Sequence, residues 1–500
     1  MNIINHFKGN PFRIFVLMSF ITSMFYALIF EPISWQAKGD AVTYINMAKD
    51  FLGLSEQSFD QSHRQPLYAL FIVPFIWVFG EHSFLYPLMI SHFLLIFASS
   101  LLIYKTFEKL NLWKPLPFIV GVIYLFNIST IFYGYNLISE TLALFIFVWL
   151  TYLLVVHSTK QSYKTLVFLG IANGLMVLAR YNTMGIPLVT LIGLGIIHYH
   201  HNGFNRSLLF LKKAFTYAVA VLFILNFWMR YNFENKGFYG LIQKDNPRFD
   251  LAIYSRIKSD IEISDKNKAV YNIFLNNKNK LSGKKANSEI KFKKGSLLKH
   301  PLFNKIFFFF NPQKKESNYV GGWALYKESQ DELYNYFDID DNDPDKMSKL
   351  AKAMEPFNEE LREETKDIEM RQRLSSLLQT FRPVSGTLPV DEPLNLNALP
   401  SWVFKIYKIG FVGLMLFTVA YSIIWALRRI WYLRSEKRYM LFLLIILIFY
   451  FPASHFYALS GGDANRFKFP AEPIYIGLFI YYIYMFFHKA KNKLKKSNIT

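Results

Sequence analysis

Residues 11–30 read PFRIFVLMSFITSMFYALIF, a run in which Arg13 is the only charged residue. A hydrocarbon core about 30 Å thick needs about 20 apolar residues of helix to cross it. The run has no small-residue cleavage site, and Glu31-Pro32-Ile33 follow it directly. We therefore expect a retained first membrane span that also directs insertion, and not a signal peptide that is removed.

Apolar runs of similar length recur along the whole chain. The sequence is 52% hydrophobic and 18% aromatic, which is typical of a protein with many membrane spans. The fold class predicted is therefore an all-α polytopic membrane protein with about ten transmembrane helices. The segment Pro66–Phe79 is apolar but short and contains Pro74, so we expect an interfacial or re-entrant piece there. The predicted spans lie near residues 12–31, 83–104, 116–133, 137–157, 164–180, 184–199, 210–229, 402–427, 439–458 and 468–487.

The distribution of basic residues predicts the orientation. A formal charge of +20 is also found in nucleic-acid-binding proteins, but here many basic residues sit in short loops between apolar runs. Short loops on one side hold roughly twenty Lys and Arg residues, whereas those on the other side hold six. By the positive-inside rule, both termini are cytoplasmic and residues 32–82 and 231–401 face outward. No nucleic-acid partner is expected. The six basic residues in the loops predicted to face outward are Lys38, Lys49, Arg64, Arg180, Arg466 and Lys468.

Three parts of the chain follow from this topology. Residues 1–230 form an N-terminal transmembrane module with a first outer loop at 32–82, and residues 402–500 form a C-terminal module with a basic tail. Residues 231–401 form an extracytoplasmic domain, which we expect to be mixed but mostly helical because apolar residues recur at helical spacing. These residues are Met347, Leu350, Ala351, Met354, Phe357 and Leu361. The chain has no cysteine, which excludes disulfides and thiolate metal sites.

The first outer loop contains two polar motifs. In KGDAVTY at 38–44, Asp40 begins a stretch with apolar residues at helical intervals, which predicts an amphipathic helix along the outer surface. Asp40 suits the N-cap of that helix equally well. In HRQPLY at 63–68, Arg64 has a planar fork that suits phosphate oxygens, although an arginine beside a membrane also commonly snorkels.

Other charged residues lie at the outer ends of later spans. Glu140 begins one span, where it either caps the helix or stands at the rim of a site. Arg180, Arg230 and Arg466 stand at three more outer ends. Each has a structural explanation by itself, but two acids and four arginines from six places all map to one membrane face. That pattern predicts a site at the rim of the bundle.

These motifs resemble the GT-C superfamily of lipid-sugar-dependent glycosyltransferases, in particular the group around aminoarabinose transferase and the protein O-mannosyltransferases. GDAVTYINMA at 39–48 is similar to the acidic motif of the first outer loop, and HRQPLY to the basic-Pro-aromatic stretch. Glu140 stands at the second acidic position, where relatives often have Asp. The resemblance covers roughly 1–240 and 400–490, and no motif matches at 241–400. The later motifs are Ala179-Arg180-Tyr181, Trp228-Met229-Arg230-Tyr231-Asn232 and Arg466-Phe467 with Pro470, Glu472 and Pro473.

The resemblance implies an enzyme that transfers a hexose or pentose from a polyprenyl-phosphate donor to a hydroxyl of a glycan, lipid or protein. It would act at the outer face of a bacterial plasma membrane. Asp40 would be the base of an inverting displacement, and Glu140 would orient the acceptor or a neighbouring cation. Arginines would contact the phosphate. The substrate-binding residues implied are Tyr44, His63, Arg64, Tyr68, Arg180, Tyr181, Arg230 and Arg466.

Two other functions stay open at this point. A lipid or glycan transporter or flippase would place ionisable residues near the bilayer midplane, where this chain has only a few polar residues (His92, Asn173 and Asn226). A membrane-anchored binding protein would use the 231–401 domain. No cofactor or metal is predicted, although a divalent cation is possible if the fold brings His63 near Asp40 and Glu140. The large outer loop has no Asn-x-Ser/Thr sequon, which favours a bacterial membrane.

Overall fold

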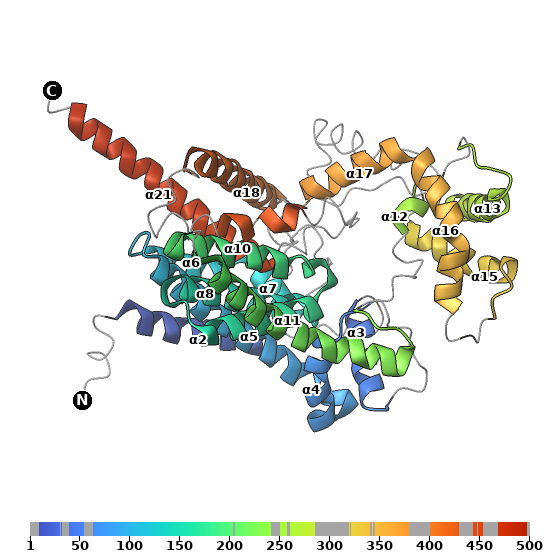
Figure 1. Ribbon diagram of the computed structural model, residues 1–500, viewed down its shortest axis with the longest axis horizontal. Helices are drawn as coiled ribbons and strands as arrows, with labels where there is room; N and C mark the ends of the chain where they lie inside the picture. The colour runs from blue at the N-terminus through green and yellow to red at the C-terminus, as the bar shows by residue number, and fades with distance from the viewer. Residues whose placement is uncertain are drawn as a thin grey trace.

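The computed structural model shows an all-α polytopic membrane protein, and the described regular structure is helical (Figure 1). The structure describes residues 10–30, 32, 40–54, 64–203, 206–241, 251–257, 261–285, 320, 322–340, 343, 346–379, 401–429, 444–447, 449–453 and 469–497.

Seven helices in the described part of the chain are long and apolar enough to cross a membrane. All seven coincide with spans predicted from the sequence. One difference is that the last helix before the outer domain continues to Lys236, past the boundary predicted at 230. The seven candidate spans lie in α2 (Pro11–Ile29), α5 (Leu85–Leu110), α8 (Glu140–Lys160), α10 (Ile186–Asn202), α11 (Ser207–Lys236), α18 (Ser401–Arg429) and α21 (Glu472–Ser497).

The other three predicted spans are shorter or bent. The 116–133 span is two helices, α6 (Leu116–Leu125) and α7 (Ile128–Tyr135), which meet at 49°. The bend has a local cause, because the Asn127 side chain accepts a hydrogen bond from the backbone N–H of Ser129 (3.0 Å) and starts a new helix. The 164–180 span is α9 (Tyr163–Ala179), and part of the 439–458 span is helical over 444–453.

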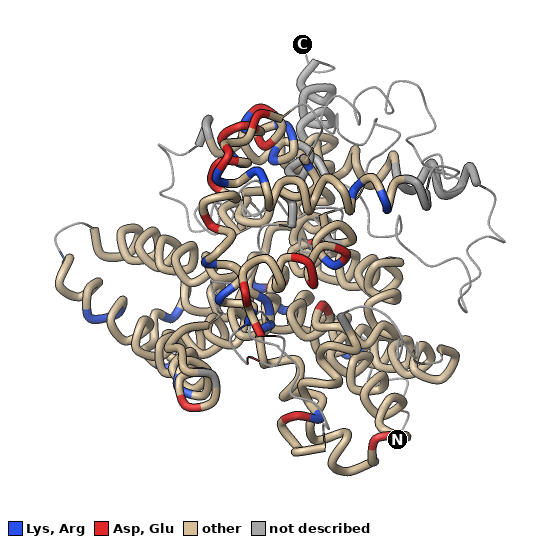
Figure 2. Tube along the Cα trace, turned by 90° about the vertical axis from the view of Figure 1, so that its right-hand side faces the viewer, with Lys and Arg blue, Asp and Glu red and all other residues tan. Residues whose placement is uncertain are grey.

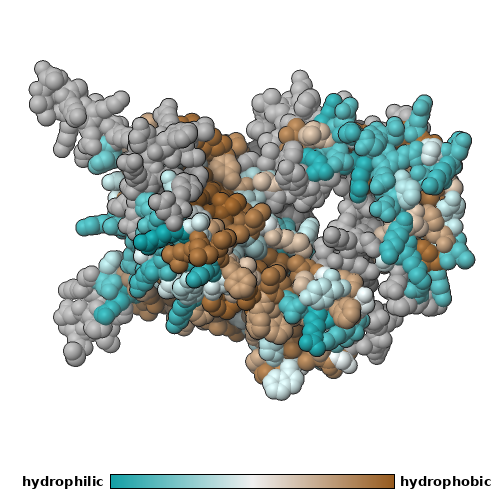
Figure 3. Space-filling model, viewed as in Figure 1, coloured by the Kyte–Doolittle hydropathy of each residue, from teal (hydrophilic) through white to brown (hydrophobic). Residues whose placement is uncertain are grey.

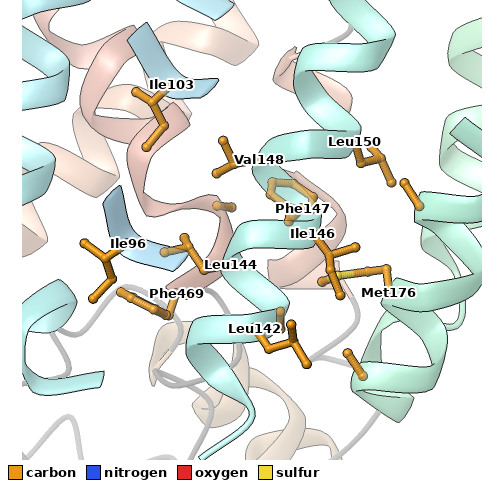
Figure 4. Packing of buried hydrophobic residues seen from close by; sticks show 14 of the residues in the cluster. Ile96, Ile103, Leu142, Leu144, Ile146, Phe147, Val148, Leu150, Met176 and Phe469 are labelled. Atoms are coloured by element: carbon orange, nitrogen blue, oxygen red, sulfur yellow. The ribbon is translucent and has the colours of Figure 1, made fainter. Parts of the chain in front are cut away.

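Helix α8 lies at the centre of the N-terminal module. Its residues are apolar on every side, as expected for a helix that is surrounded by others. Figure 4 shows its side chains facing Ile96 and Ile103 of α5 on one side and Met176 of α9 on the other, with Phe469 near Leu144. The N-terminal end of α8, which begins with Glu140, is thereby fixed by packing along the whole helix.

Two glycines let α9 and α11 pack closely. Gly170 and Gly174 are one turn apart on α9, and a Cβ at either would meet α11 at less than 3 Å. Small residues at this spacing allow two helix backbones to approach in a membrane, where lipid gives no hydrophobic drive to pair them. The contact helps to fix the C-terminal end of α9, which Arg180 follows.

We expect Gly170→Ala to lower the free energy of unfolding by about 1–3 kcal/mol, because the added methyl group overpacks this contact. Its Cβ would lie 2.5 Å from Cβ of Ala220 and 2.7 Å from the backbone oxygen of Tyr217. Gly195→Ala on α10 is the matched control, since its nearest neighbour would be a ring atom of Phe210 at 3.5 Å. Thermal unfolding in detergent measures both, and equal melting temperatures would contradict the packing.

The outer-loop helix lies against one end of the bundle. Helix α3 (Asp40–Phe51) packs on α4 (Leu67–Ser83), and Phe51 meets the rings of Trp228 and Tyr231 on α11. Pro74 is accommodated inside α4, which breaks at Gly80 (φ 74°). In Figure 1, α3 lies at the opposite end of the bundle from the start of α2 and the end of α21.

The described part of the outer domain has a hydrophobic core of its own. The predicted 347–361 helix is confirmed as α16, whose apolar face enters this core. In Figure 1 the domain lies apart from the bundle, and its surface is largely hydrophilic where that of the bundle is hydrophobic (Figure 3). Charged residues are likewise gathered in patches, while long stretches of helix carry none (Figure 2). The domain helices are α12 (Leu251–Tyr254), α13 (Lys268–Lys285), α15 (Gly322–Tyr336), α16 (Lys346–Glu364) and α17 (Lys366–Gln379).

Buried Arg256 ties α12 to the other end of this domain. Its guanidinium donates to Glu369 (2.9 Å), Gln372 (2.8 Å) and Thr365 (3.2 Å). A buried guanidinium needs such partners, because an unpaired charge away from water is costly. The domain is therefore held by a polar cluster as well as by its apolar core.

Candidate active site

A buried ion pair joins two of the residues singled out in the sequence. Glu140 is the first residue of α8, and Arg180 follows the last residue of α9 in extended conformation (φ −153°, ψ 130°). The guanidinium Nη1 lies 2.9 Å from Oε1 of Glu140, and the two side chains are 7% and 0% exposed. The sequence predicted both at the outer rim, but not that they bind each other.

The two outer-loop motifs also meet. The ring of Tyr44 on α3 packs edge-on against Tyr68 on α4, with 5.1 Å between ring centroids. The half-buried Arg64 lies over the Tyr44 ring, with Cζ 5.8 Å from the centroid, which is within the range of a cation–π contact. A short helix and the start of the next one thus bring an aromatic pair and an arginine together.

His92 on α5 extends this group into the bundle. Its Nε2 lies 3.1 Å from the hydroxyl of Tyr68, within hydrogen-bond distance. The His92 ring also packs beside Tyr68, with 5.7 Å between ring centroids. Sequence reasoning treated His92 only as a mid-span polar residue. A histidine inside an otherwise apolar helix was the available signal, but its partner was not predictable.

A tyrosine from the C-terminal module holds the turn that follows Arg180. The hydroxyl of Tyr450 donates to the backbone oxygen of Asn182 (2.7 Å) and accepts from the backbone N–H of Gly185 (3.0 Å). A Cβ at Gly185 would lie 2.7 Å from the Tyr450 ring, so only glycine leaves room for this contact. Thr183 closes the turn from inside by donating to the backbone oxygens of Arg180 and Met176.

A second carboxylate is buried at the start of α21. Glu472 accepts a hydrogen bond from Nδ2 of Asn127 (3.2 Å), the residue that caps α7. It follows the short helix η9 (Phe469–Ala471), whose Phe469 packs on Tyr133 with 4.3 Å between ring centroids. The predicted closing element before the last span therefore packs against α7 and α8.

Asp40 is placed by its backbone alone. It is the first residue of α3, one helical turn before Tyr44, whereas its side chain lies outside the described residues. The predicted amphipathic helix is confirmed, because Ala41, Tyr44 and Ala48 are buried along one face. Its start therefore lies near the Tyr44–Tyr68 pair.

The structure places two of the remaining predicted residues, Arg230 and Tyr181. Arg230 on α11 is 73% exposed and pairs with Glu234 (2.7 Å). Tyr181 is half-buried in the short helix η1 (Tyr181–Thr183). His63 and Arg466 lie outside the described residues. Among the residues that are described, no group of three His, Cys, Asp or Glu side chains is placed to hold a metal ion.

No protein-family model matches this chain, and no curated protein matches its sequence. Among solved structures it is similar to the archaeal oligosaccharyltransferase AglB from Archaeoglobus fulgidus, in complex with an inhibitory peptide and a dolichol-phosphate. The identity is 13% and the TM-score 0.46. The match covers 98% of this chain and 52% of AglB, so the chain spans about half the length of AglB.

The chain is also similar to ArnT from Cupriavidus metallidurans. The apo structure gives 12% identity and a TM-score of 0.34, covering 94% of this chain and 75% of ArnT. The structure bound to undecaprenyl phosphate gives 11% and 0.36, covering 92% and 77%.

Proposed function

We propose that this chain is an integral membrane glycosyltransferase. It moves a sugar from a polyprenyl-phosphate donor to a hydroxyl of a glycan, lipid or protein at the outer face of a bacterial plasma membrane, with both termini in the cytoplasm. One observation carries the proposal. The buried Glu140–Arg180 pair joins the start of α8 to the end of α9, and α9 contacts α4, whose first turn carries Tyr68 beside Tyr44.

The reaction is a single displacement at the anomeric carbon. The acceptor oxygen forms a bond to that carbon, the bond from the carbon to the phosphate oxygen breaks, and the polyprenyl phosphate leaves. Asp40 takes the proton of the acceptor hydroxyl, because a carboxylate is a suitable general base. The product sugar has inverted configuration because only one displacement takes place.

Cations stabilise the departing phosphate. Arg64 is best placed for this role, because it is half-buried beside Tyr44, one turn from the start of α3. A guanidinium binds two phosphate oxygens at once with fixed geometry. Glu140 is paired with Arg180, and in this proposal it orients that cation.

Turnover of a radiolabelled lipid-linked sugar by the purified protein in detergent tests the proposal. Release of the sugar to an acceptor or to water, with polyprenyl phosphate as the other product, supports transfer. A transporter or flippase would leave the sugar on its lipid and would move it between leaflets in proteoliposomes. Movement that depends strictly on an ion gradient, with no cleavage of the sugar–phosphate bond, would replace this proposal by the transporter.

A further inference from the structure

Two buried carboxamides stand out in the N-terminal module. Gln65 is 2% exposed and Asn182 is 8% exposed. Neither the amide nitrogen nor the amide oxygen of either side chain has a hydrogen-bond partner among the residues that the structure describes. Other buried carboxamides find partners inside the chain. Asn136 and Asn173 donate to the backbone oxygens of Phe132 and Leu169.

Both carboxamides belong to the candidate active site. Gln65 lies three residues before Tyr68, on which the charge of Glu140 acts. Asn182 lies two residues after Arg180, which pairs with Glu140, and its backbone is held by Tyr450. Helices α4 and α9, which these residues flank, are in contact. The two carboxamides therefore flank a pair of helices in contact, and burial without partners makes their amide atoms costly unless a ligand satisfies them.

The chemistry of the amides indicates what that ligand is. A carboxamide both donates and accepts hydrogen bonds. A sugar hydroxyl does the same and so is its natural complement, whereas a phosphate only accepts bonds and would face the amide oxygen unfavourably. We propose that Gln65 and Asn182 bind hydroxyl groups of the donor sugar and so select a neutral, hydroxyl-bearing sugar. This inference rests on the proposed function and adds the residues that recognise the sugar.

A ligand-binding role and a structural role predict opposite effects on stability. If the amides serve only the fold, replacing them would lower the melting temperature. If the amides bind a ligand, Gln65→Met and Asn182→Leu remove polar atoms that have no hydrogen-bond partner in the ligand-free protein. The melting temperature should then stay the same or rise. Asn173→Leu is the matched control: it breaks the bond from Thr190 to the Asn173 amide oxygen (3.2 Å) and should lower the melting temperature.

Binding of bare and sugar-loaded lipids in detergent then tests the role in recognition. The probes are undecaprenyl phosphate and undecaprenyl phosphate carrying glucose, mannose or arabinose, each measured by the rise in melting temperature with lipid concentration. We expect at least one loaded lipid to bind the wild type more tightly than the bare lipid. Gln65→Met and Asn182→Leu should each weaken loaded-lipid binding by about 10-fold, while bare-lipid binding changes by less than about 2-fold. Asn173→Leu should leave the preference for loaded lipid unchanged.

The failure of this inference and the failure of the proposed function are distinguishable. If the wild type binds neither the bare nor the loaded lipids, the proposed function itself fails. If the lipids bind and both amide variants keep the wild-type preference for loaded lipid, the proposed function stands and the carboxamide inference is overturned. The inference is also overturned if the variants lose bare-lipid binding equally, or if the wild type shows no preference for any loaded lipid.

Discussion

Asp40→Asn should lower sugar transfer by about 10²–10⁴-fold, the range that a positioned general base contributes. The substitution keeps the size of the side chain and removes the group that takes the acceptor proton. Asp40 begins α3, so an N-cap is the competing explanation for its presence. Asn caps a helix about as well as Asp. If Asp40 serves only as a cap, Asp40→Asn should therefore have almost no effect on transfer. Transfer of radiolabelled sugar and the melting temperature should both be measured on the same purified protein.

The same helix supplies the control for this experiment. Asp50 lies near the other end of α3, next to Phe51, which packs against Tyr231 of α11. Asp50→Asn should leave transfer within about 2-fold of the wild type, since it changes the charge of the helix without removing the base. If Asp40→Asn keeps more than a tenth of the activity, or if both variants lose activity equally, Asp40 is not the base.

The sequence was sufficient to predict where the helices lie, because a bilayer requires apolar runs of a certain length. It missed what happens within a run. The bend at Asn127 could have been found in the letters FNIS, where a capping residue interrupts an apolar stretch, but a single span was the simpler interpretation of 116–133. The continuation of α11 to Lys236 was missed because its last turns are polar and lie beyond the part that an apolar run detects.

The site was predictable by residue type but not by partner. Glu140 and Arg180 were both expected at the outer rim from topology, yet their pairing depends on how α8 and α9 pack. Tyr450 could not be assigned to the site at all, since it contacts Gly185 across 265 positions of sequence and carries no motif. Arg230 was predicted to bind substrate because it stands at the end of a span. In the structure it instead pairs with Glu234, one turn further along the same helix.

The Glu140–Arg180 pair allows a second test, which separates its contribution to the fold from its contribution to the reaction. Glu140→Gln or Arg180→Met alone leaves one charge buried without its partner, which costs about 3–5 kcal/mol of unfolding free energy. The double variant removes both charges, and such replacements of buried pairs are often neutral or stabilising. We therefore expect the melting temperature to fall in both single variants and to recover in the double one.

Transfer should not recover with stability. If Arg180 and Glu140 organise the region where the phosphate and the acceptor meet, the double variant should be as well folded as the wild type. It should still transfer sugar at least about 10²-fold more slowly, because removing one preorganised electrostatic group causes a loss of that size. The exposed Arg230–Glu234 pair is the control, because breaking a solvent-exposed pair should change neither the melting temperature nor transfer measurably. A double variant that regains wild-type transfer would show that the buried pair only holds α8 to α9, and the reaction would then have to depend on Asp40 and Arg64 without it.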